Sequence, residues 1–183
     1  MIIGICGKSG SGKSTLAKRI MNYSDKEALH LEIDKVGHQV LLLPEVRGEL
    51  VEAFGEGVLK DDYVDRKRLG DIVFASREEM AKLTEITWKY MQIEIDKVIE
   101  SNPGKLIILD WILLPQSKYF EMSNIKVLLD IPYEIRKSRA IKRDGISEEA
   151  FDLRDSASIE YDSDSFDFVI KKEEDYKRLE MIL

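Results

Sequence analysis

The stretch Gly7-Lys8-Ser9-Gly10-Ser11-Gly12-Lys13-Ser14-Thr15 decides how the rest of the chain is interpreted. It follows a short apolar run, Ile2–Cys6, and precedes a segment with the apolar spacing of a helix. The pattern G-x-x-x-x-G-K-[ST] between a strand and a helix is the P-loop, whose glycines let backbone N–H groups point at phosphate oxygens. The alternative is a glycine-rich turn that merely joins two elements, but the Gly-Lys-Ser ending favours phosphate binding.

Each part of this loop has an expected role. Lys13 reaches the β- and γ-phosphates, and the Ser14 hydroxyl binds Mg²⁺. The amino end of the following helix adds partial positive charge. We therefore predict that the chain binds ATP together with Mg²⁺. The predicted ATP-binding residues of the loop are Gly7, Lys8, Ser9, Gly10, Ser11, Gly12, Lys13, Ser14 and Thr15.

The composition limits the class of protein. With 183 residues, 44% apolar and 34% charged, the chain suits one soluble domain with a sizeable core. The net charge of −7 argues against nucleic acid as the main partner. Its single cysteine, Cys6, cannot form an internal disulfide. We expect no signal peptide and no membrane span, and hence a cytoplasmic protein. The sequence does not indicate an oligomeric state.

Five apolar runs have the character of buried parallel strands, with helical patterns between them. This alternation predicts a three-layer α/β fold, a five-stranded parallel sheet flanked by helices. We find no linker or repeat, so residues 1–183 are expected to form a single domain. Helices at about 45–101 would form an insertion that builds an acceptor pocket, and its long helix, Arg77–Glu100, would bury one stripe. The predicted strands are Ile2–Cys6, Ala28–Ile33, Leu106–Leu109, Lys126–Leu129 and Phe166–Ile170, and the predicted stripe is Met80, Leu83, Ile86, Tyr90 and Ile93.

Two aspartates follow predicted strands at the edge where ligands bind in open α/β sheets. Asp34 could take a proton from an acceptor hydroxyl, bind Mg²⁺, or both, and the alternative is a helix N-cap. Asp110 is expected on the magnesium side, the alternative being a capping residue at an ordinary strand end. His38 lies four residues after Asp34 and could contact the acceptor or serve packing. His30, inside a strand, is expected to be structural.

A basic helix after the fourth strand places Arg136, Arg139 and Arg143 on one face, and Arg154 follows on the next helix. Guanidiniums that close over ATP would neutralise charge on the transferred phosphoryl group, whereas a solvated basic face is the alternative. The apolar segment 111–116 suits either a pocket wall or a buried loop. A short C-terminal helix is expected to turn Tyr176, Leu179 and Leu183 inward.

These residues together resemble the dephospho-coenzyme A kinase family over nearly the whole chain. After the P-loop, Glu32-Ile33-Asp34-Lys35-Val36-Gly37-His38 is similar to the family's D-A-D-x-I-x-H. The segment 64–74, V-D-R-K-R-L-G-D-I-V-F, is similar to its L-D-R-x-x-L-x-x-x-V-F. Arg139, Arg143 and Arg154 match its lid and following-helix arginines. The run F-D-F-V-I at 166–170 resembles its closing A-D-x-V-I.

The resemblance implies a P-loop kinase fold with a lid at about 138–160, and transfer of the γ-phosphoryl of ATP to the 3′-hydroxyl of dephospho-coenzyme A. It implies catalytic roles for Asp34, Lys13, Arg139 and Arg143, with Arg143 and Arg154 also binding ATP. Mg²⁺ would be held by Ser14, Asp34 and Asp110. Acceptor binding is expected from His38, Arg66, Leu69, Phe74, Trp111 and Gln116.

The departures from the family pattern lie mostly on the acceptor and lid side. Glu32 replaces the first aspartate of D-A-D, Thr87-Trp88 stands where His-Pro is usual, and segment 111–116 replaces V-P-L-L-F-E. Ser158 replaces a glutamine, and Glu160–Ser165 is acidic where the family is usually basic. Two alternatives therefore stay open. One is a kinase of another hydroxyl acceptor, such as a nucleoside or nucleotide, and the other is a non-catalytic ATP-binding relative.

Overall fold

The computed structural model describes residues 1–181, and the chain divides into two compact units. The first, called the nucleotide unit here, joins Met1–Glu32 to the chain from Gly104 onward. The second, called the helical unit, is Ile33–Pro103, which is wider than the insertion expected at about 45–101. That both units act as one domain stays a prediction. No helix within residues 1–181 combines the length and apolar character needed to cross a bilayer.

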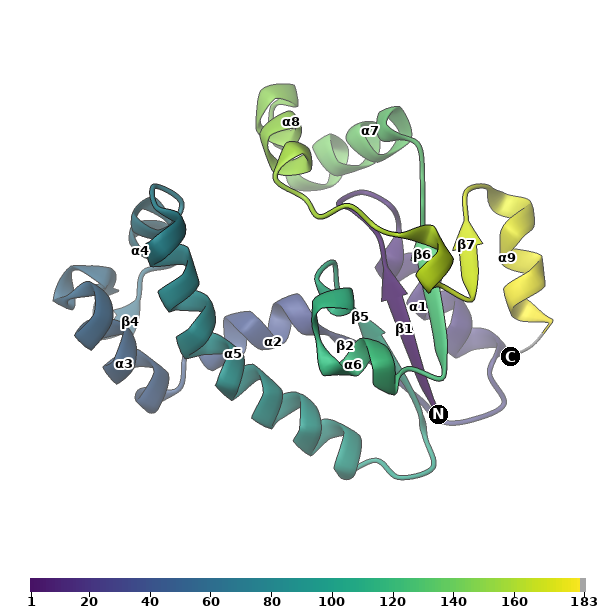
Figure 1. Cartoon of the computed structure of the whole chain (residues 1–183), viewed down its shortest axis with the longest axis horizontal. Coiled ribbons are helices and arrows are strands. Elements are labelled where there is room, and N and C mark those ends of the chain that lie inside the picture. Colours follow the sequence, from purple (N-terminus) through teal and green to yellow (C-terminus); the bar gives the residue numbers. More distant parts are fainter. Residues whose placement is uncertain (182–183) are drawn as a thin grey trace. The chain divides into compact units, whose positions relative to one another are not determined.

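A five-stranded sheet forms the centre of the nucleotide unit, in the order β2-β5-β1-β6-β7 (Figure 1). All four pairings are parallel, as the apolar runs predicted. The second strand is shorter than expected because Ile33 and Asp34 already belong to a helix. The strands are β1 (Ile2–Cys6), β2 (Ala28–Glu32), β5 (Leu106–Asp110), β6 (Ile125–Leu129) and β7 (Phe168–Ile170).

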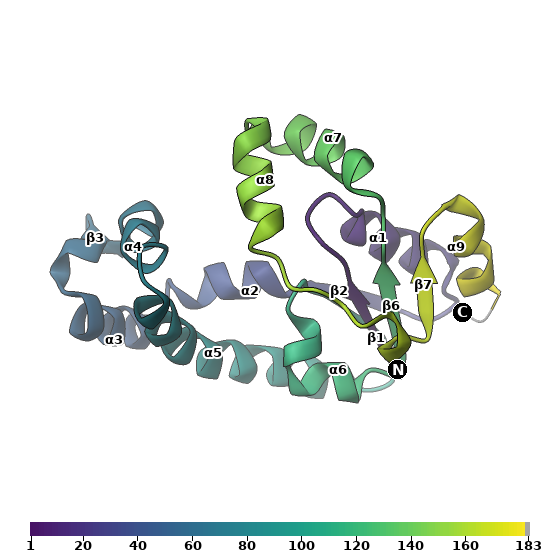
Figure 2. The same ribbon diagram turned by 45° about the horizontal axis from the view of Figure 1, so that its top comes forward.

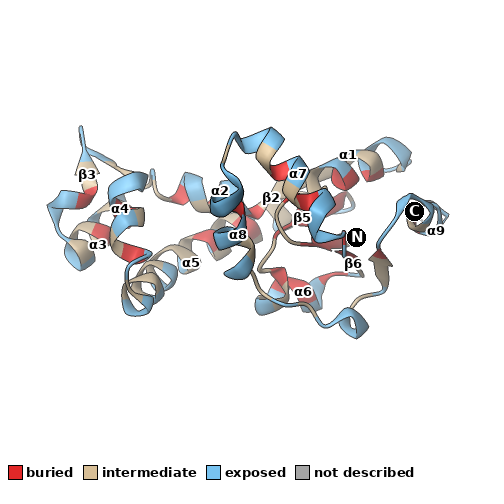
Figure 3. Cartoon of the chain, turned by 90° about the horizontal axis from the view of Figure 1, so that it is seen from above, coloured by how far each residue is buried: buried red, intermediate tan, exposed pale blue. Residues whose placement is uncertain are grey.

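Helices cover both faces of this sheet, which confirms the three-layer prediction. Helices α1 (Lys13–Tyr23) and α9 (Glu173–Glu180) share one apolar cluster with the strands, in which Ile3, Ile20 and Leu179 are almost fully buried. Tyr176 packs against this cluster as predicted, whereas Leu183 lies outside the described residues. The layer on the opposite face is the 3-10 turn η2 (Leu114–Gln116) and α6 (Lys118–Met122), whose buried residues are Leu114, Tyr119 and Phe120; Figure 3 shows α6 partly red.

Gly4 in β1 allows the second layer to pack closely against the sheet. A Cβ at this position would lie 2.7 Å from Ser123 Oγ and 2.8 Å from a methyl group of Leu114. No larger side chain fits without displacing them.

A helical hairpin follows β6, in the region where the sequence predicts a lid, and is called the lid below (Figure 2). It consists of α7 (Tyr133–Asp144) and α8 (Glu148–Ser156), joined through Gly145. Gly145 ends α7 in the left-handed conformation, at φ 64°, and Ser147 caps α8 by accepting a hydrogen bond from the Ala150 N–H. A strap, residues 157–167 with the 3-10 turn η3 (Ser163–Ser165), then leads to β7.

The helical unit contains α2 (Ile33–Val40), α3 (Pro44–Phe54), the 3-10 turn η1 (Glu56–Val58), α4 (Arg66–Val73) and α5 (Arg77–Glu100). It also contains a hairpin that the sequence did not predict, β3 (Leu59–Lys60) with β4 (Tyr63–Val64). Asp61 and Asp62 make its turn, both with positive φ, a conformation that aspartate tolerates better than most residues.

The long helix α5 begins and ends where predicted, but its expected apolar stripe is partly wrong. Met91 and Ile95 are buried, whereas Ile93 is 59% exposed. Helix α2 packs on α5 through Gly37, where a Cβ would lie 3.4 Å from the Met91 methyl group. The face of α5 that meets α2 therefore includes Met91 and Ile95, four residues apart, and Ile93 points elsewhere.

Candidate functional site

The loop between β1 and α1 has the backbone conformation that its glycines allow. Gly10 and Gly12 have φ values of 79° and 95°, which strain other residues. A Cβ at Gly10 would lie 2.2 Å from the Arg136 carbonyl oxygen, so the start of α7 closes tightly on the loop. Gly12 caps α1 in the left-handed region, and the helix begins at Lys13. This places the amino end of α1 directly behind the loop, as phosphate binding requires.

Lys13 and Ser11 give the loop its polar character. Lys13 Nζ donates to the Gly7 carbonyl oxygen at 2.9 Å, so the side chain folds back over the loop that it follows. Ser11 Oγ is buried and has no hydrogen-bond partner within residues 1–181. A bound polar ligand would compensate a buried polar atom of this kind.

Ser14 Oγ donates to Asp110 Oδ2 at 2.9 Å, across 96 residues of sequence. The Asp110 side chain is only 5% exposed, at the carboxyl end of β5. Its Oδ2 also lies 3.2 Å from Nε2 of His30 on the adjacent strand β2, where His30 pairs with Ile108. A hydroxyl and a carboxylate in contact are the hard oxygen ligands that Mg²⁺ prefers, so Ser14 and Asp110 fit the expected metal.

Arg139, on α7, lies close to the P-loop. Its Nη1 would lie 3.8 Å from a Cβ at Gly12, at the amino end of α1. Arg136 does not join it on an exposed face, contrary to the sequence interpretation, because its side chain is buried. Its guanidinium donates to the carbonyl oxygens of Ile131 and Ser9 and forms an ion pair with Asp155 at 2.5 Å. Arg136 therefore ties the lid to the P-loop.

Arg143 and Arg154 meet at one carboxylate. Asp144 accepts from Arg143 Nε at 2.6 Å and from Arg154 Nη1 at 2.8 Å. The two guanidiniums therefore lie in the same cluster, and the closure of Arg154 over ATP stays a prediction.

The strap from the lid to β7 holds the beginning of the P-loop. Tyr161 Oη accepts from the Gly7 N–H at 3.2 Å and donates to the Ile112 carbonyl oxygen at 2.8 Å. Lys8 forms an ion pair with Glu160 at 2.5 Å. The acidic strap, a departure from the family pattern, thus has a basic partner in the loop itself.

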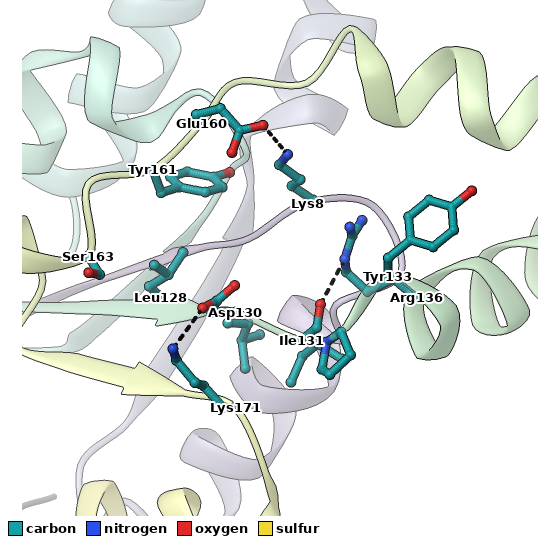
Figure 4. Close-up of a pocket in the computed structure, with 12 residues that line it drawn as sticks. Lys8, Leu128, Asp130, Ile131, Tyr133, Arg136, Glu160, Tyr161, Ser163 and Lys171 are labelled. Carbon is teal, nitrogen blue, oxygen red and sulfur yellow. Dashed lines mark hydrogen bonds and ion pairs between the residues drawn. The ribbon is translucent and has the colours of Figure 1, made fainter.

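Beside these contacts lies a pocket of about 470 Å³ (Figure 4). Its floor includes Leu128 and Ile131, and the pairs Lys8–Glu160 and Asp130–Lys171 lie along its sides. The described charged side chains around it are mutually paired. Lys8, a residue of the loop, also lines the pocket, which therefore adjoins the predicted phosphate-binding loop.

Cys6 lies at the end of β1, beneath the loop, and is fully buried. Burial raises the pKa of its thiol to about 12, and the nearby Lys13 charge lowers it only in part. The thiol is therefore neutral at physiological pH and packs as a small apolar group.

In the helical unit, four predicted acceptor residues line one pocket of about 510 Å³. Leu69 is buried at its floor and Phe74 is 83% exposed. Met80 and Leu83 add apolar surface, and Lys67 lies beside Arg66. The four predicted residues are His38, Arg66, Leu69 and Phe74.

Asp34 lies in the first turn of α2, one residue inside the helix. It therefore lies just beyond the end of β2, as predicted, but inside the helix rather than at its N-cap, and the helix dipole favours a carboxylate in this first turn. The other two predicted acceptor residues belong to the nucleotide unit. Trp111 is buried after β5, and Gln116 is exposed in η2. Their binding roles, like that of Asp34, stay predictions.

Sequence reasoning missed three residues that organise the site. His30 was interpreted as structural, and an alternating strand pattern gives no sign that it faces Asp110. The role of Asp144 could have been suspected from the sequence, since Asp144 directly follows Arg143 at the end of a basic helix. The role of Tyr161 could not, because its contacts with Gly7 and Ile112 span 154 and 49 residues.

Comparisons with known proteins show which family the chain belongs to. A family model described as Dephospho-CoA kinase matches residues 1–175. A dephospho-CoA kinase of Aquifex aeolicus is 35% identical, covering 98% of this chain and 94% of that protein. Another, of Fusobacterium nucleatum, is 31% identical, covering 81% and 76% respectively.

Solved structures support the fold. A Thermus thermophilus protein is similar with a TM-score of 0.84 at 24% identity, covering 100% of this chain and 95% of that one. A dephospho-CoA kinase of Campylobacter jejuni is similar with a TM-score of 0.59 at 23% identity, covering 98% and 92%. From the family model and the relatives in sequence, we conclude that this chain belongs to the dephospho-CoA kinase family.

Proposed function

We propose that this chain transfers the γ-phosphoryl group of ATP to the 3′-hydroxyl of dephospho-coenzyme A, giving coenzyme A. The observation that carries the proposal is the P-loop of a member of this family, with Lys13 folded over the loop and Ser14 in contact with Asp110. A glycine-rich turn that only joined two elements would have no need of these contacts. We further propose that residues 1–183 act as one catalytic domain, with its lid at about 138–160.

The residues of the nucleotide unit would bind and orient ATP. Backbone N–H groups of Gly7–Thr15 and the Lys13 ammonium would hold the phosphates. Ser14 and Asp110 would hold Mg²⁺, which when bound neutralises phosphate charge. Arg139, Arg143 and Arg154 would stabilise the charge that develops on the transferred group. The nucleotide is in this way fixed for in-line transfer.

Asp34 would orient the acceptor hydroxyl and take its proton as transfer proceeds. Its position in the first turn of α2, ahead of His38 on the same helix, supports a place near the acceptor pocket of the helical unit. A contribution of Asp34 to Mg²⁺ binding is part of the same proposal.

The pocket of the helical unit has the mixed character that dephospho-coenzyme A requires. Its lining is mainly apolar, with Phe74, Met80 and Leu83, and suits an adenine ring or a pantetheine chain. Arg66 and Lys67 supply positive charge for the diphosphate. Trp111 and Gln116 would extend acceptor binding from the nucleotide unit. A cytoplasmic location is proposed with this function.

The test is release of ADP from Mg-ATP, measured with a coupled assay in the presence and absence of dephospho-coenzyme A. We expect a rate that depends on the acceptor, with product phosphorylated at the 3′-oxygen. A panel of nucleosides and nucleotides tests the other-acceptor alternative. Release with a panel member but not with dephospho-coenzyme A would overturn the substrate. ATP binding with no acceptor-dependent release would indicate the non-catalytic relative.

A further inference from the structure

The strongest unassigned feature of the nucleotide unit is the carboxylate at the end of α7. Asp144 Oδ1 accepts from Arg143 Nε at 2.6 Å, and its Oδ2 accepts from Arg143 Nη2 at 2.9 Å. The same Oδ2 accepts from Arg154 Nη1 at 2.8 Å. One carboxylate therefore fixes two guanidiniums, one on each helix of the lid.

The cluster keeps a net positive charge and faces solvent. Hydrogen bonds from Arg143, and then those from Arg154, lower the pKa of Asp144 to about 2, so it is ionised at neutral pH. The Asp144 side chain is 24% exposed, compared with 61% for Arg143 and 47% for Arg154. The carboxylate thus lies inward of the two cations, which are accessible to an anion.

Both guanidiniums keep donors after pairing with Asp144. A guanidinium carries five N–H groups. Arg143 gives Asp144 its Nε and one Nη2 hydrogen, and Arg154 gives one Nη1 hydrogen. The remaining hydrogens include both on Arg143 Nη1 and those on Arg154 Nε and Nη2. A paired arginine can therefore still bind phosphate oxygens.

The lid has contacts besides those of Asp144 that hold its two helices together. Its helices are also joined by the buried Arg136–Asp155 ion pair at 2.5 Å. Lys137 adds ion pairs with Glu148 at 2.9 Å and with Asp152 at 3.2 Å. Phe151 is fully buried on the hairpin. An exposed ion pair adds little stability beyond such contacts, so a role in positioning explains Asp144 better than a role in folding.

We infer that Asp144 is a positioning residue that holds Arg143 and Arg154 as a preformed pair for the phosphate groups of ATP. The inference rests on the proposed function, which gives these arginines their ligand. Long side chains lose rotamer freedom when they bind, and a pair fixed in advance loses less. Asp144 contacts neither reactant and acts only through the two arginines.

The first test is Asp144→Asn, which keeps the shape of the side chain and removes its charge. We expect the affinity for a fluorescent ATP analogue, measured without acceptor, to fall about tenfold because the arginines are no longer held. Asp144→Glu should restore part of it. Asp152→Asn is the matched control, since Asp152 is also an exposed lid carboxylate but pairs with Tyr133 and Lys137.

Unchanged affinity in Asp144→Asn would overturn the inference. Tighter binding would overturn it too, because it would mean that Asp144 competes with ATP for the arginines. Binding of the ATP analogue is measured without acceptor. A failure of the proposed phosphoryl transfer can therefore be told apart from a failure of this inference. Circular dichroism and Tm verify folding, and if Asp144→Asn does not fold, Asp144→Glu carries the same comparison with the wild type.

A double-mutant cycle with Arg154→Ala separates positioning from structure. If Asp144 acts through Arg154, the loss caused by Arg154→Ala should be smaller in the Asp144→Asn background than in the wild type. Fully additive losses would overturn the inference. In the coupled assay, the same variants should change kcat/KM for ATP and leave the acceptor KM within about twofold.

Discussion

The two units of this chain prepare their candidate sites in different ways. In the nucleotide unit, polar side chains from distant parts of the sequence hold one another, as in the Ser14–Asp110–His30 contacts. In the helical unit, the candidate residues line a mainly apolar pocket whose aromatic wall, Phe74, is 83% exposed. The first arrangement fixes charged groups and the proposed metal ligands before the ligand binds. The pocket of the helical unit instead presents exposed apolar surface that a bound ligand would bury.

This difference predicts different kinetic consequences. Losing a group that is fixed for the transition state lowers kcat, whereas losing apolar contact with the bound substrate raises KM. Substitutions among the Ser14–Asp110–His30 contacts should therefore act mainly on turnover. Substitutions in the pocket of the helical unit should act mainly on acceptor KM, with Asp34 as the exception.

The largest effect is expected from Asp34→Asn, which tests that exception. An amide cannot accept the proton of the acceptor hydroxyl, and general-base catalysis contributes roughly 10²- to 10⁴-fold. We expect kcat to fall by at least about 10²-fold, while ATP affinity changes little. Coupled ADP release measures turnover, and a fluorescent ATP analogue measures affinity. Turnover near that of the wild type would remove Asp34 from its proposed role.

His30→Leu should produce a smaller loss in the nucleotide unit. Without the Nε2 contact, Asp110 Oδ2 keeps only its bond from Ser14, and we expect kcat to fall about tenfold with a higher Mg²⁺ requirement. Fluorescent titration of nucleotide binding with and without Mg²⁺ provides a second readout. His30→Gln, which keeps an N–H donor, is the matched variant. Equal losses in both variants would show that packing, rather than the contact with Asp110, is what matters.

How far the sequence predicts the molecule depends on whether a feature is local. The P-loop, the five strands and the bounds of α5 follow from patterns within short segments, because strand and helix periodicity is a local property. The shared pocket of His38, Arg66, Leu69 and Phe74 was anticipated through the family resemblance, although their binding roles stay predictions.

Features that depend on tertiary contact could not be predicted in this way. The direction of the His30 side chain depends on which strand lies beside β2, and β5 is far along the chain. The basic face of α7 also looked uniform in sequence. In the structure, Arg136 is buried and forms an ion pair with Asp155. The sequence does not show that the fold brings these two side chains together.

Phe74→Ala should give a moderate effect confined to the acceptor. An aromatic contact contributes about 0.5–1.5 kcal/mol, so we expect KM for dephospho-coenzyme A to rise roughly 2- to 12-fold with kcat and ATP affinity unchanged. Tm should stay close to that of the wild type because the ring is exposed. Tyr63→Ala is the control, since Tyr63 is another exposed aromatic residue of the helical unit, at 64%, outside the lining of the pocket. A fall in kcat instead would mean that this pocket is organised like the nucleotide site.

The last prediction concerns stability rather than activity, and it tests whether water is excluded beneath the P-loop, where Cys6 is buried. Burial raises the pKa of Cys6 from 9.0 to about 12, so the unfolded chain loses this proton first as pH rises. The contribution of Cys6 to stability is therefore complete below about pH 9 and is lost towards pH 12, by about 1.4 kcal/mol per pH unit.

Urea unfolding of the wild type and Cys6→Ala at pH 7.5 and 10.5 measures this loss. Lysines and tyrosines titrate in both proteins, so their effects cancel in the difference. We expect the stability of the wild type, relative to the variant, to decrease at the higher pH. A constant difference would mean that water or a neighbouring charge stabilises the thiolate in the folded state. The nucleotide unit would then be less rigidly closed beneath its loop than the contacts of Ser14 and Asp110 suggest, and the contrast with the helical unit would weaken.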